Sequence, residues 1–179
     1  SNKCLEGVPG VGFILVRKSV LQTSKNNSHS LSLDLYDQWE SMEKNAQWRF
    51  TPPTHVLAAF NQALIEHQKE GGTKGRYQRY YKNCKIICEG MAKMGFKQLL
   101  SNELQAPIII TFLQPKVPNF DFKKFYNSLS DKGFLIYPGK LTVADTFRIG
   151  CIGHLNEKDM KDAIIAVENT LKDLNIKLS

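Results

Sequence analysis

The chain has 179 residues, of which 42% are apolar and 23% are charged, a composition that excludes wholesale disorder. No apolar run approaches the roughly 20 residues of a membrane-spanning helix. No basic segment followed by an apolar stretch opens the chain, so we expect neither a membrane span nor a secretory signal. Four cysteines are too few for a disulfide scaffold, which favours a cytoplasmic location.

The net charge is +7, and most of the surplus lies between residues 71 and 100. Apolar residues in this segment recur at three- and four-residue spacing, as in an amphipathic helix: Tyr77, Tyr80, Tyr81, Cys84, Ile87, Cys88, Met91 and Met94. A basic helix with tyrosines could bind nucleic acid, with the rings stacked on bases. We favour a core-facing stripe with a solvated basic face, because the tyrosines fall on the apolar stripe. No nucleic-acid partner is therefore expected.

In the first half of the chain, a glycine-rich turn over residues 7–12 leads into an expected strand over Phe13 to Val16. Residues 22–33 are polar and short-sided, which predicts a loop. Residues 34–45 predict a short helix. A second helix follows Pro53 and is broken at Gly71–Gly72, and the basic helix ends at Gly95.

In the second half, strands and helices alternate. Strands are expected over residues 96–100, 108–113, 134–137 and 147–152. Helices are expected over residues 122–132 and 158–174, the second with Asn156 as its N-cap. Strands mixed with helices, without an internal repeat, predict a compact α/β domain in which helices cover one face of a small sheet.

Lys3 lies just before the glycine-rich turn and an apolar segment. A lysine held at a strand end beside apolar surroundings can act as a Schiff-base nucleophile, although a single lysine is more often an ordinary surface charge. Cys84 and Cys88 share one face of the basic helix. No pair of histidines or cysteines elsewhere has ligand spacing, so core packing is expected for them and no metal site.

Thr51-Pro52-Pro53 predicts a helix start with Thr51 as N-cap and proline in the first turn. The free N–H groups of such a start can bind a phosphate, with the threonine hydroxyl as a further donor. The alternative is a cap that only stabilises its own helix, which local sequence alone favours.

Arg148 lies inside an apolar strand, where a guanidinium needs an acidic partner. Asp145 and Asp121 could supply this partner, and a ligand carboxylate is the alternative. Before any resemblance is considered, the two interpretations are about even.

Five blocks of this sequence resemble the 2-aminoethylphosphonate–pyruvate aminotransferases, which are pyridoxal-phosphate (PLP) enzymes of fold type I and class V. The blocks cover essentially the whole chain in the family's order: Ser1 to Phe13, Ser30 to Trp39, Trp48 to Val56, Phe134 to Lys140 and Ala144 to Gly150. The resemblance implies an α/β fold, the C-terminal part of a fold-type I transferase.

The resemblance also implies roles for four residues. Lys3 would hold PLP covalently and move the proton during the reaction. Thr51 would contact the PLP phosphate, in this family from the neighbouring subunit of a homodimer, and Asn2 would also reach the phosphate. Arg148 would grip the carboxylate of pyruvate and alanine. The implied reaction converts 2-aminoethylphosphonate and pyruvate into phosphonoacetaldehyde and L-alanine.

Members of this family have a long region before the lysine, whereas this sequence starts almost at the lysine. We therefore expect residues 1–70 to be a remnant of the large PLP-binding domain with an interdomain helix, and residues 71–179 to be the small C-terminal α/β domain. This chain alone is expected to bind PLP poorly and to catalyse little or no transamination. Two alternatives stay open: an inactive fragment that serves folding or dimerisation, and an alanine–glyoxylate-type aminotransferase.

Overall fold

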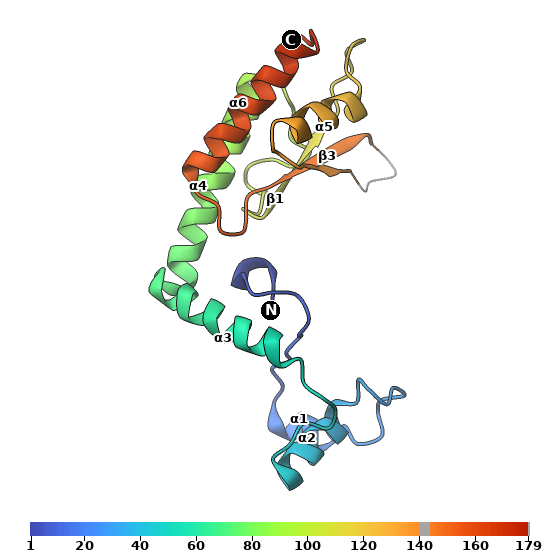
Figure 1. Cartoon of the computed structure of the whole chain (residues 1–179). Coiled ribbons are helices and arrows are strands. Elements are labelled where there is room, and N and C mark those ends of the chain that lie inside the picture. The colour runs from blue at the N-terminus through green and yellow to red at the C-terminus, as the bar shows by residue number, and fades with distance from the viewer. Residues whose placement is uncertain (140–143, 179) are drawn as a thin grey trace. The chain divides into compact units, whose positions relative to one another are not determined.

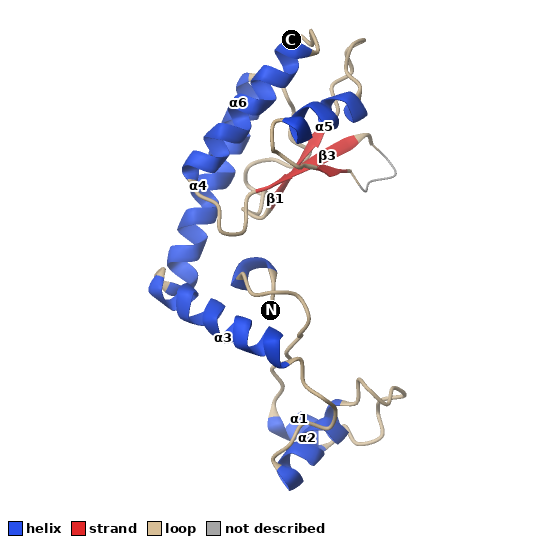
Figure 2. Cartoon of the chain, viewed as in Figure 1, coloured by secondary structure: helices blue, strands red, loops and turns tan. Residues whose placement is uncertain are grey.

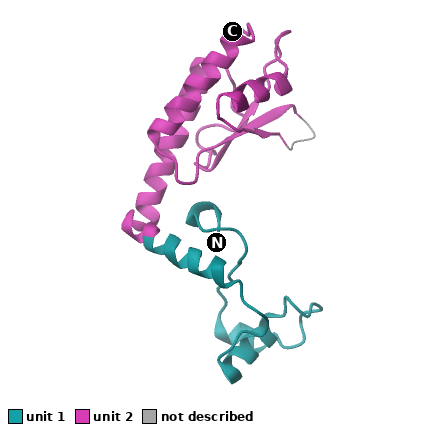
Figure 3. Ribbon diagram, viewed as in Figure 1, with its two compact units in different colours: residues 1–65 teal, residues 66–179 magenta. Residues whose placement is uncertain are grey.

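The computed structural model of the chain describes residues 1–139 and 144–178, and the contacts between residues divide it into two units. Unit 1 comprises Ser1–Ile65 and unit 2 comprises Glu66–Ser179 (Figure 3). The division falls inside helix α3 (Thr54–Lys69), a few residues before the boundary after residue 70 that the sequence suggested. Lys140, the last residue of one of the five blocks, lies outside the described residues.

The regular secondary structure of unit 1 is helical (Figures 1 and 2). It contains a single 3-10 turn, η1, two short helices and most of α3; the bounds are η1 (Lys3–Leu5), α1 (Lys18–Gln22), α2 (Leu35–Asn45) and α3 (Thr54–Lys69). The carboxylate of Asp34 caps α2 by accepting a hydrogen bond from the backbone N–H of Asp37. The predicted helix over residues 34–45 is thus confirmed, whereas α1 was not predicted.

The strand expected over Phe13 to Val16 is wrong. These residues belong to no strand, and their side chains are between 43% and 92% exposed. A strand is stable only when neighbouring backbone pairs with it, and the described part of unit 1 contains no strand that could do so. The ring of Phe13 packs instead on a helix, stacked against Phe60 of α3 at 5.8 Å between centroids.

Unit 2 contains an antiparallel three-stranded sheet with the strand order β1-β3-β2. Its elements are α4 (Gly72–Lys93), β1 (Ile109–Leu113), α5 (Phe122–Asp131), β2 (Tyr137–Pro138), β3 (Thr146–Gly150) and α6 (Glu157–Asp173). The strand expected over residues 96–100 is reduced to a single bridge between Gln98 and Phe112. Asn156 caps α6 as predicted, in a capping box with Asp159.

The two faces of this sheet differ. Ile110 and Phe112 of β1 pair with Ile149 and Phe147 of β3, and all four side chains belong to the buried core. The helices of unit 2, α4, α5 and α6, pack beside this sheet (Figure 1). The alternate residues lie on the opposite, open face: Thr111 of β1, Arg148 of β3 and Tyr137 of β2. The prediction of a small sheet with helices on one face is confirmed, and Arg148 lies on the face that the helices leave open.

Helix α4 packs against α6 but buries fewer aromatic residues than its spacing suggested. Tyr80 is buried, whereas Tyr77 and Tyr81 are each 54% exposed and stack on one another. A helix buries a stripe about 100° wide, and here Arg76 and Asn83 lie at the centre of that stripe beside Tyr80. The prediction that all three tyrosines face the core is therefore wrong for Tyr77 and Tyr81.

The cysteines of α4 pack as the sequence predicted. Cys84 is buried in the core and Cys88 is half-buried against it, with 3.8 Å between their sulfur atoms. The hydrogen bond with Cys151, together with burial, raises the pKa of the Cys84 thiol, and the hydrogen bond with Cys84, together with burial, raises that of the Cys88 thiol. Across residues 1–139 and 144–178, no cluster of three histidine, cysteine or acidic side chains could hold a metal ion. Over the same residues, no helix combines the length and the apolar character that a membrane span requires.

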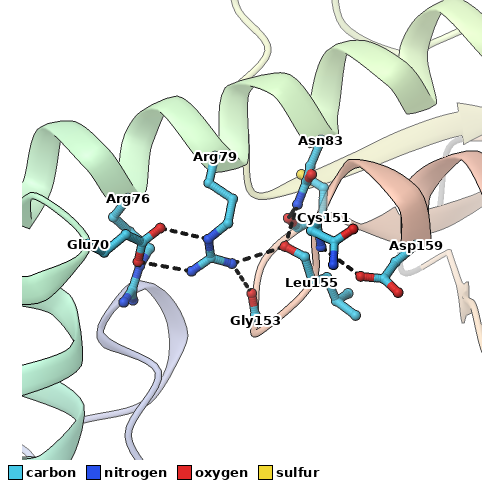
Figure 4. A network of polar contacts seen from close by, with 9 residues as sticks. Glu70, Arg76, Arg79, Asn83, Cys151, Gly153, Leu155 and Asp159 are labelled. Carbon is cyan, nitrogen blue, oxygen red and sulfur yellow. Dashed lines mark hydrogen bonds and ion pairs between the residues drawn. The ribbon is translucent and has the colours of Figure 1, made fainter.

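A polar network ties the loop between β3 and α6 to α4 (Figure 4). Arg79 makes a two-pronged contact with Glu70, at 2.7 and 3.2 Å, and donates to the backbone carbonyl of Gly153. The side-chain amide of Asn83 donates to the carbonyls of Cys151 and Leu155, at 3.3 and 3.0 Å. The network fixes the connection that follows the strand of Arg148.

Glu70 also contacts the buried Arg76, so this carboxylate pairs with two arginines of α4. Hydrogen bonding from Arg79 lowers its pKa from 4.5 to about 2, with Arg76 adding to the effect. The ionised form of Glu70 therefore stabilises the folded state above pH 4.5. This contribution is lost as the pH falls from about 4.5 towards about 2.

Substitution of Glu70 with glutamine is expected to lower the free energy of unfolding at pH 7 by about 2 kcal/mol, because the ion pairs of Glu70 with Arg76 and Arg79 are lost. The difference in free energy of unfolding between the variant and the wild type should shrink as the pH falls below 4.5. Protonation of Glu70 then removes its contribution in the wild type, whereas glutamine does not titrate. Urea denaturation at pH 7 and pH 3 measures both effects. The control is Glu89→Gln, which removes an exposed carboxylate 3.8 Å from Lys85 and should change stability by less than about 0.5 kcal/mol. An equal loss in both variants would contradict the account of Glu70.

Candidate functional site

Lys3 begins the turn η1 and its side chain is exposed. Its backbone adopts a φ of 53°, in the left-handed region that residues other than glycine rarely occupy. The turn is closed by backbone hydrogen bonds from Glu6 to the carbonyl of Lys3 and from Gly7 to that of Ser1, each 3.0 Å long. Strained backbone held by such contacts is common at functional sites. The structure thus presents Lys3 on a tight, hydrogen-bonded turn instead of at the end of a strand.

The segment that follows Lys3 lies along the N-terminal half of α3 (Figure 1). A Cβ atom added at Gly10, where φ is 137°, would come within 2.9 Å of the Val56 side chain, and one at Gly7 within 3.3 Å of the Phe60 ring. Together with the Phe13–Phe60 stack, these contacts press the glycine-rich turn against the helix. Glycine is needed at position 10 because its φ lies in the left-handed region and a Cβ atom there would collide with the Val56 side chain.

Thr51 precedes α3 but is not its N-cap, so that prediction is wrong. The first helical hydrogen bond runs from the N–H of Leu57 to the carbonyl of Pro53, which places the helix start two residues later. Pro53 disfavours helical backbone at Pro52, the residue before it, so the helix begins only after the second proline. The exposed hydroxyl of Thr51 lies at an open hollow lined by residues 46–52.

The start of α3 still offers donors to an anion. Within the described residues, the backbone N–H groups of His55 and Val56 have no hydrogen-bond acceptor. They lie in the first turn of a 16-residue helix, where the helix dipole favours negative charge. Asn2, next to Lys3, makes no capping hydrogen bond with its side chain. Its amide is therefore another polar group close to the lysine.

Arg148 is half-buried on the open face of the sheet in unit 2. Its Nε–H donates to the backbone carbonyl of Pro138 at 3.2 Å, and its guanidinium carbon lies 5.9 Å from the centre of the Tyr137 ring. In the part of the chain that the structure describes, it forms no ion pair with Asp121, Asp145 or any other carboxylate. Among these same residues no hydrogen bond engages the two terminal nitrogens of the guanidinium, which form a planar fork of the kind that binds an acid.

The predicted site residues are divided between the two units. Lys3, Asn2 and Thr51 belong to unit 1, and Arg148 belongs to unit 2. Among the described residues, no hydrogen bond or ion pair joins Lys3 to Thr51. The sequence analysis missed the contacts of Tyr137 and Pro138 with Arg148. These contacts depend on the register of β2 against β3, and no local pattern in the sequence specifies that register.

Comparison with known proteins shows extensive similarity to one group of enzymes. The chain is 52% identical over 176 residues to a 2-aminoethylphosphonate–pyruvate transaminase of Rhizobium meliloti, a match that covers 98% of the chain and 46% of that protein. It is 50% identical over 178 residues to the corresponding transaminase of Cupriavidus necator, covering 99% of the chain and 47% of that protein. The chain therefore spans about half the length of the curated relatives it matches. No family model matches it.

Solved structures share the fold at low sequence identity. Pyridoxamine–pyruvate aminotransferase from Mesorhizobium loti superposes with a TM-score of 0.70 at 20% identity, over 80% of this chain and 37% of that protein. A PLP-bound phosphoserine aminotransferase from Trichomonas vaginalis superposes with a TM-score of 0.60 at 19% identity, over 73% of this chain and 37% of that protein. Over almost its whole length, the chain is thus similar in sequence to about half of the 2-aminoethylphosphonate–pyruvate transaminases, and it shares its fold with part of the aminotransferases of known structure.

Proposed function

We propose that this chain supplies residues for the PLP-dependent transfer of the amino group of 2-aminoethylphosphonate to pyruvate, which gives phosphonoacetaldehyde and L-alanine. Identity of about 50% over almost the whole chain to transaminases of that name carries the proposal. The tight turn that presents Lys3 against α3 supports it, because an exposed amine on a fixed turn is accessible to an aldehyde.

Lys3 would bind the aldehyde of PLP through its Nζ atom. Once bound, PLP supplies an electron sink that makes a proton on the amino-bearing carbon acidic. With its amine free, Lys3 would take up that proton and return it, as a general base and then a general acid. Its position on a turn closed by backbone hydrogen bonds keeps the start of this long side chain in place.

The phosphate of PLP would be bound at the start of α3. The hydroxyl of Thr51 and the unbonded N–H groups of His55 and Val56 are donors of the kind that bind phosphate at helix N-termini. In the homodimer that we propose, these groups act on the cofactor of the partner subunit, and Asn2 reaches the phosphate beside its own lysine. The absence of a contact between Lys3 and Thr51 within the described chain is compatible with this arrangement.

Arg148 would bind the carboxylate of pyruvate or L-alanine. Its terminal nitrogens are not engaged by any described residue, and a guanidinium binds a carboxylate with two parallel hydrogen bonds. Unit 1 would then be the part of the large domain that carries the cofactor groups. Unit 2 would be the small domain that carries the acid-binding residue.

The test is a chimaera in which this chain replaces the homologous 46% of the Rhizobium meliloti transaminase. With PLP, 2-aminoethylphosphonate and pyruvate, we expect L-alanine to accumulate. The same chimaera given L-alanine and glyoxylate should react at least about tenfold more slowly, and the 179-residue chain alone serves as a comparison. A folded chimaera that forms no alanine from 2-aminoethylphosphonate, or that prefers glyoxylate, would contradict the proposal.

A further inference from the structure

The inference concerns how Arg148 is held before an acid binds, and it rests on the proposed role of Arg148 in binding a carboxylate. Tyr137 lies directly opposite Arg148 in the β2–β3 register, and the side chains of both residues are on the open face of the sheet. The guanidinium faces the tyrosine ring at 5.9 Å, within the range of a cation–π contact. The ring is 54% exposed, so this contact lies at the surface.

Pro138 provides the second contact. It lies in β2, at the edge of the sheet, where a residue without an N–H group is tolerated. Its carbonyl accepts the hydrogen bond from Nε of Arg148. The backbone N–H of Gly139 bonds to the carbonyl of Thr146 at 2.9 Å, which keeps this end of β2 on β3. The Nε atom of the guanidinium is therefore engaged, whereas no residue in the described ranges 1–139 and 144–178 hydrogen-bonds to its two terminal nitrogens.

We propose that Tyr137 is a positioning residue, whose ring, with the Pro138 carbonyl, holds the guanidinium of Arg148 ready for a carboxylate of a small 2-oxo acid or amino acid. A free arginine side chain samples many rotamers, and a ligand that must order it binds more weakly. The ring and the carbonyl restrict these rotamers in advance.

Substitution of Tyr137 with leucine tests this role because it keeps an apolar side chain on β2 and removes the aromatic face. Tyr137→Phe keeps the face and removes the hydroxyl. Tyr81→Leu is the matched control, because Tyr81 is also 54% exposed and lies on α4, with its ring stacked on Tyr77. Backbone amide NMR spectra of the 179-residue chain report whether each variant keeps the fold of unit 2.

Two measurements are made on these variants. The first is the hydrogen-exchange rate of the Arg148 Nε–H in the 179-residue chain without ligand, followed by NMR. The second is kinetics of the chimaera with pyruvate as the varied substrate. For Tyr137→Leu we expect faster exchange of the Arg148 Nε–H and a two- to fivefold higher KM for pyruvate, which corresponds to the loss of a surface cation–π contact. The kcat should change less than twofold. Tyr137→Phe and Tyr81→Leu should match the wild type within twofold.

Unchanged exchange in Tyr137→Leu would overturn the proposal, and so would equal effects of the leucine and phenylalanine variants, which would assign the effect to the hydroxyl. The exchange measurement needs no substrate or cofactor. It therefore decides the role of Tyr137 even if the chimaera proves inactive, an outcome that would count against the proposed function instead.

Discussion

Replacing Lys3 with alanine in the chimaera is expected to reduce L-alanine formation at least about a thousandfold. Lys3 is proposed both to bind the cofactor and to move the proton, and positioned acid–base catalysis alone contributes about 10²- to 10⁴-fold. The absorbance that arises when PLP is bound to the protein should be lost, and borohydride should no longer fix PLP to the chain. Alanine formation is measured with saturating 2-aminoethylphosphonate and pyruvate.

The control for this variant is Lys18→Ala. Lys18 is an exposed lysine in the same unit, at the start of α1, and its ammonium lies 6.0 Å from the centre of the Trp39 ring. Its replacement should leave alanine formation within twofold of the wild type. If Lys3→Ala and Lys18→Ala behave alike while both remain folded, Lys3 is not the catalytic amine.

Replacing Phe147 with alanine is expected to lower the stability of unit 2 by about 3–5 kcal/mol. Phe147 is fully buried, and its ring packs against four others: Phe96, Phe112, Phe122 and Phe125. Removing it leaves a cavity at the centre of this cluster. Domains of this size are typically stable by only about 5–15 kcal/mol, so the variant should approach unfolding at 37 °C. Urea denaturation followed by circular dichroism measures the loss.

Leu104→Ala is the control for packing, because Leu104 is 72% exposed in the same unit and its truncation should cost less than about 0.5 kcal/mol. Phe147 and Arg148 are neighbours on opposite faces of β3. Phe147→Ala should therefore also weaken the binding of acids, through loss of the strand that carries Arg148. A Phe147→Ala variant as stable as Leu104→Ala would contradict the core described above.

Local signals in the sequence predicted much of unit 2. Asn156 and Asp159 encode their capping box within four residues, and Gly95, with a φ of 94°, follows the end of α4 as a glycine should. The alternation of buried and less buried residues along β1, with Ile110 and Phe112 on the buried face, is also a signal from neighbouring residues. Such features are determined by residues a few positions apart, and a single sequence is enough to find them.

Features that depend on distant contacts were not predictable in this way. Residues 13–16 are apolar enough for a strand, but a strand also requires a paired neighbour. Tyr81 has the spacing of a core residue, but α6 determines which stripe of α4 is covered. The contact of Arg148 with the Tyr137 ring depends on the β2–β3 register, which joins residues distant in the sequence. The site residues themselves came mainly from the resemblance, since composition alone favoured ordinary roles for Lys3 and Thr51.

The central claim, that Lys3 is the amine that binds PLP, is tested most directly by borohydride reduction of the PLP-loaded chimaera followed by peptide mass spectrometry. The account predicts one phosphopyridoxyl group, on the peptide that contains Lys3 of this chain. A modified peptide from any other lysine, or alanine formation by a chimaera that reduction leaves unlabelled, would contradict it.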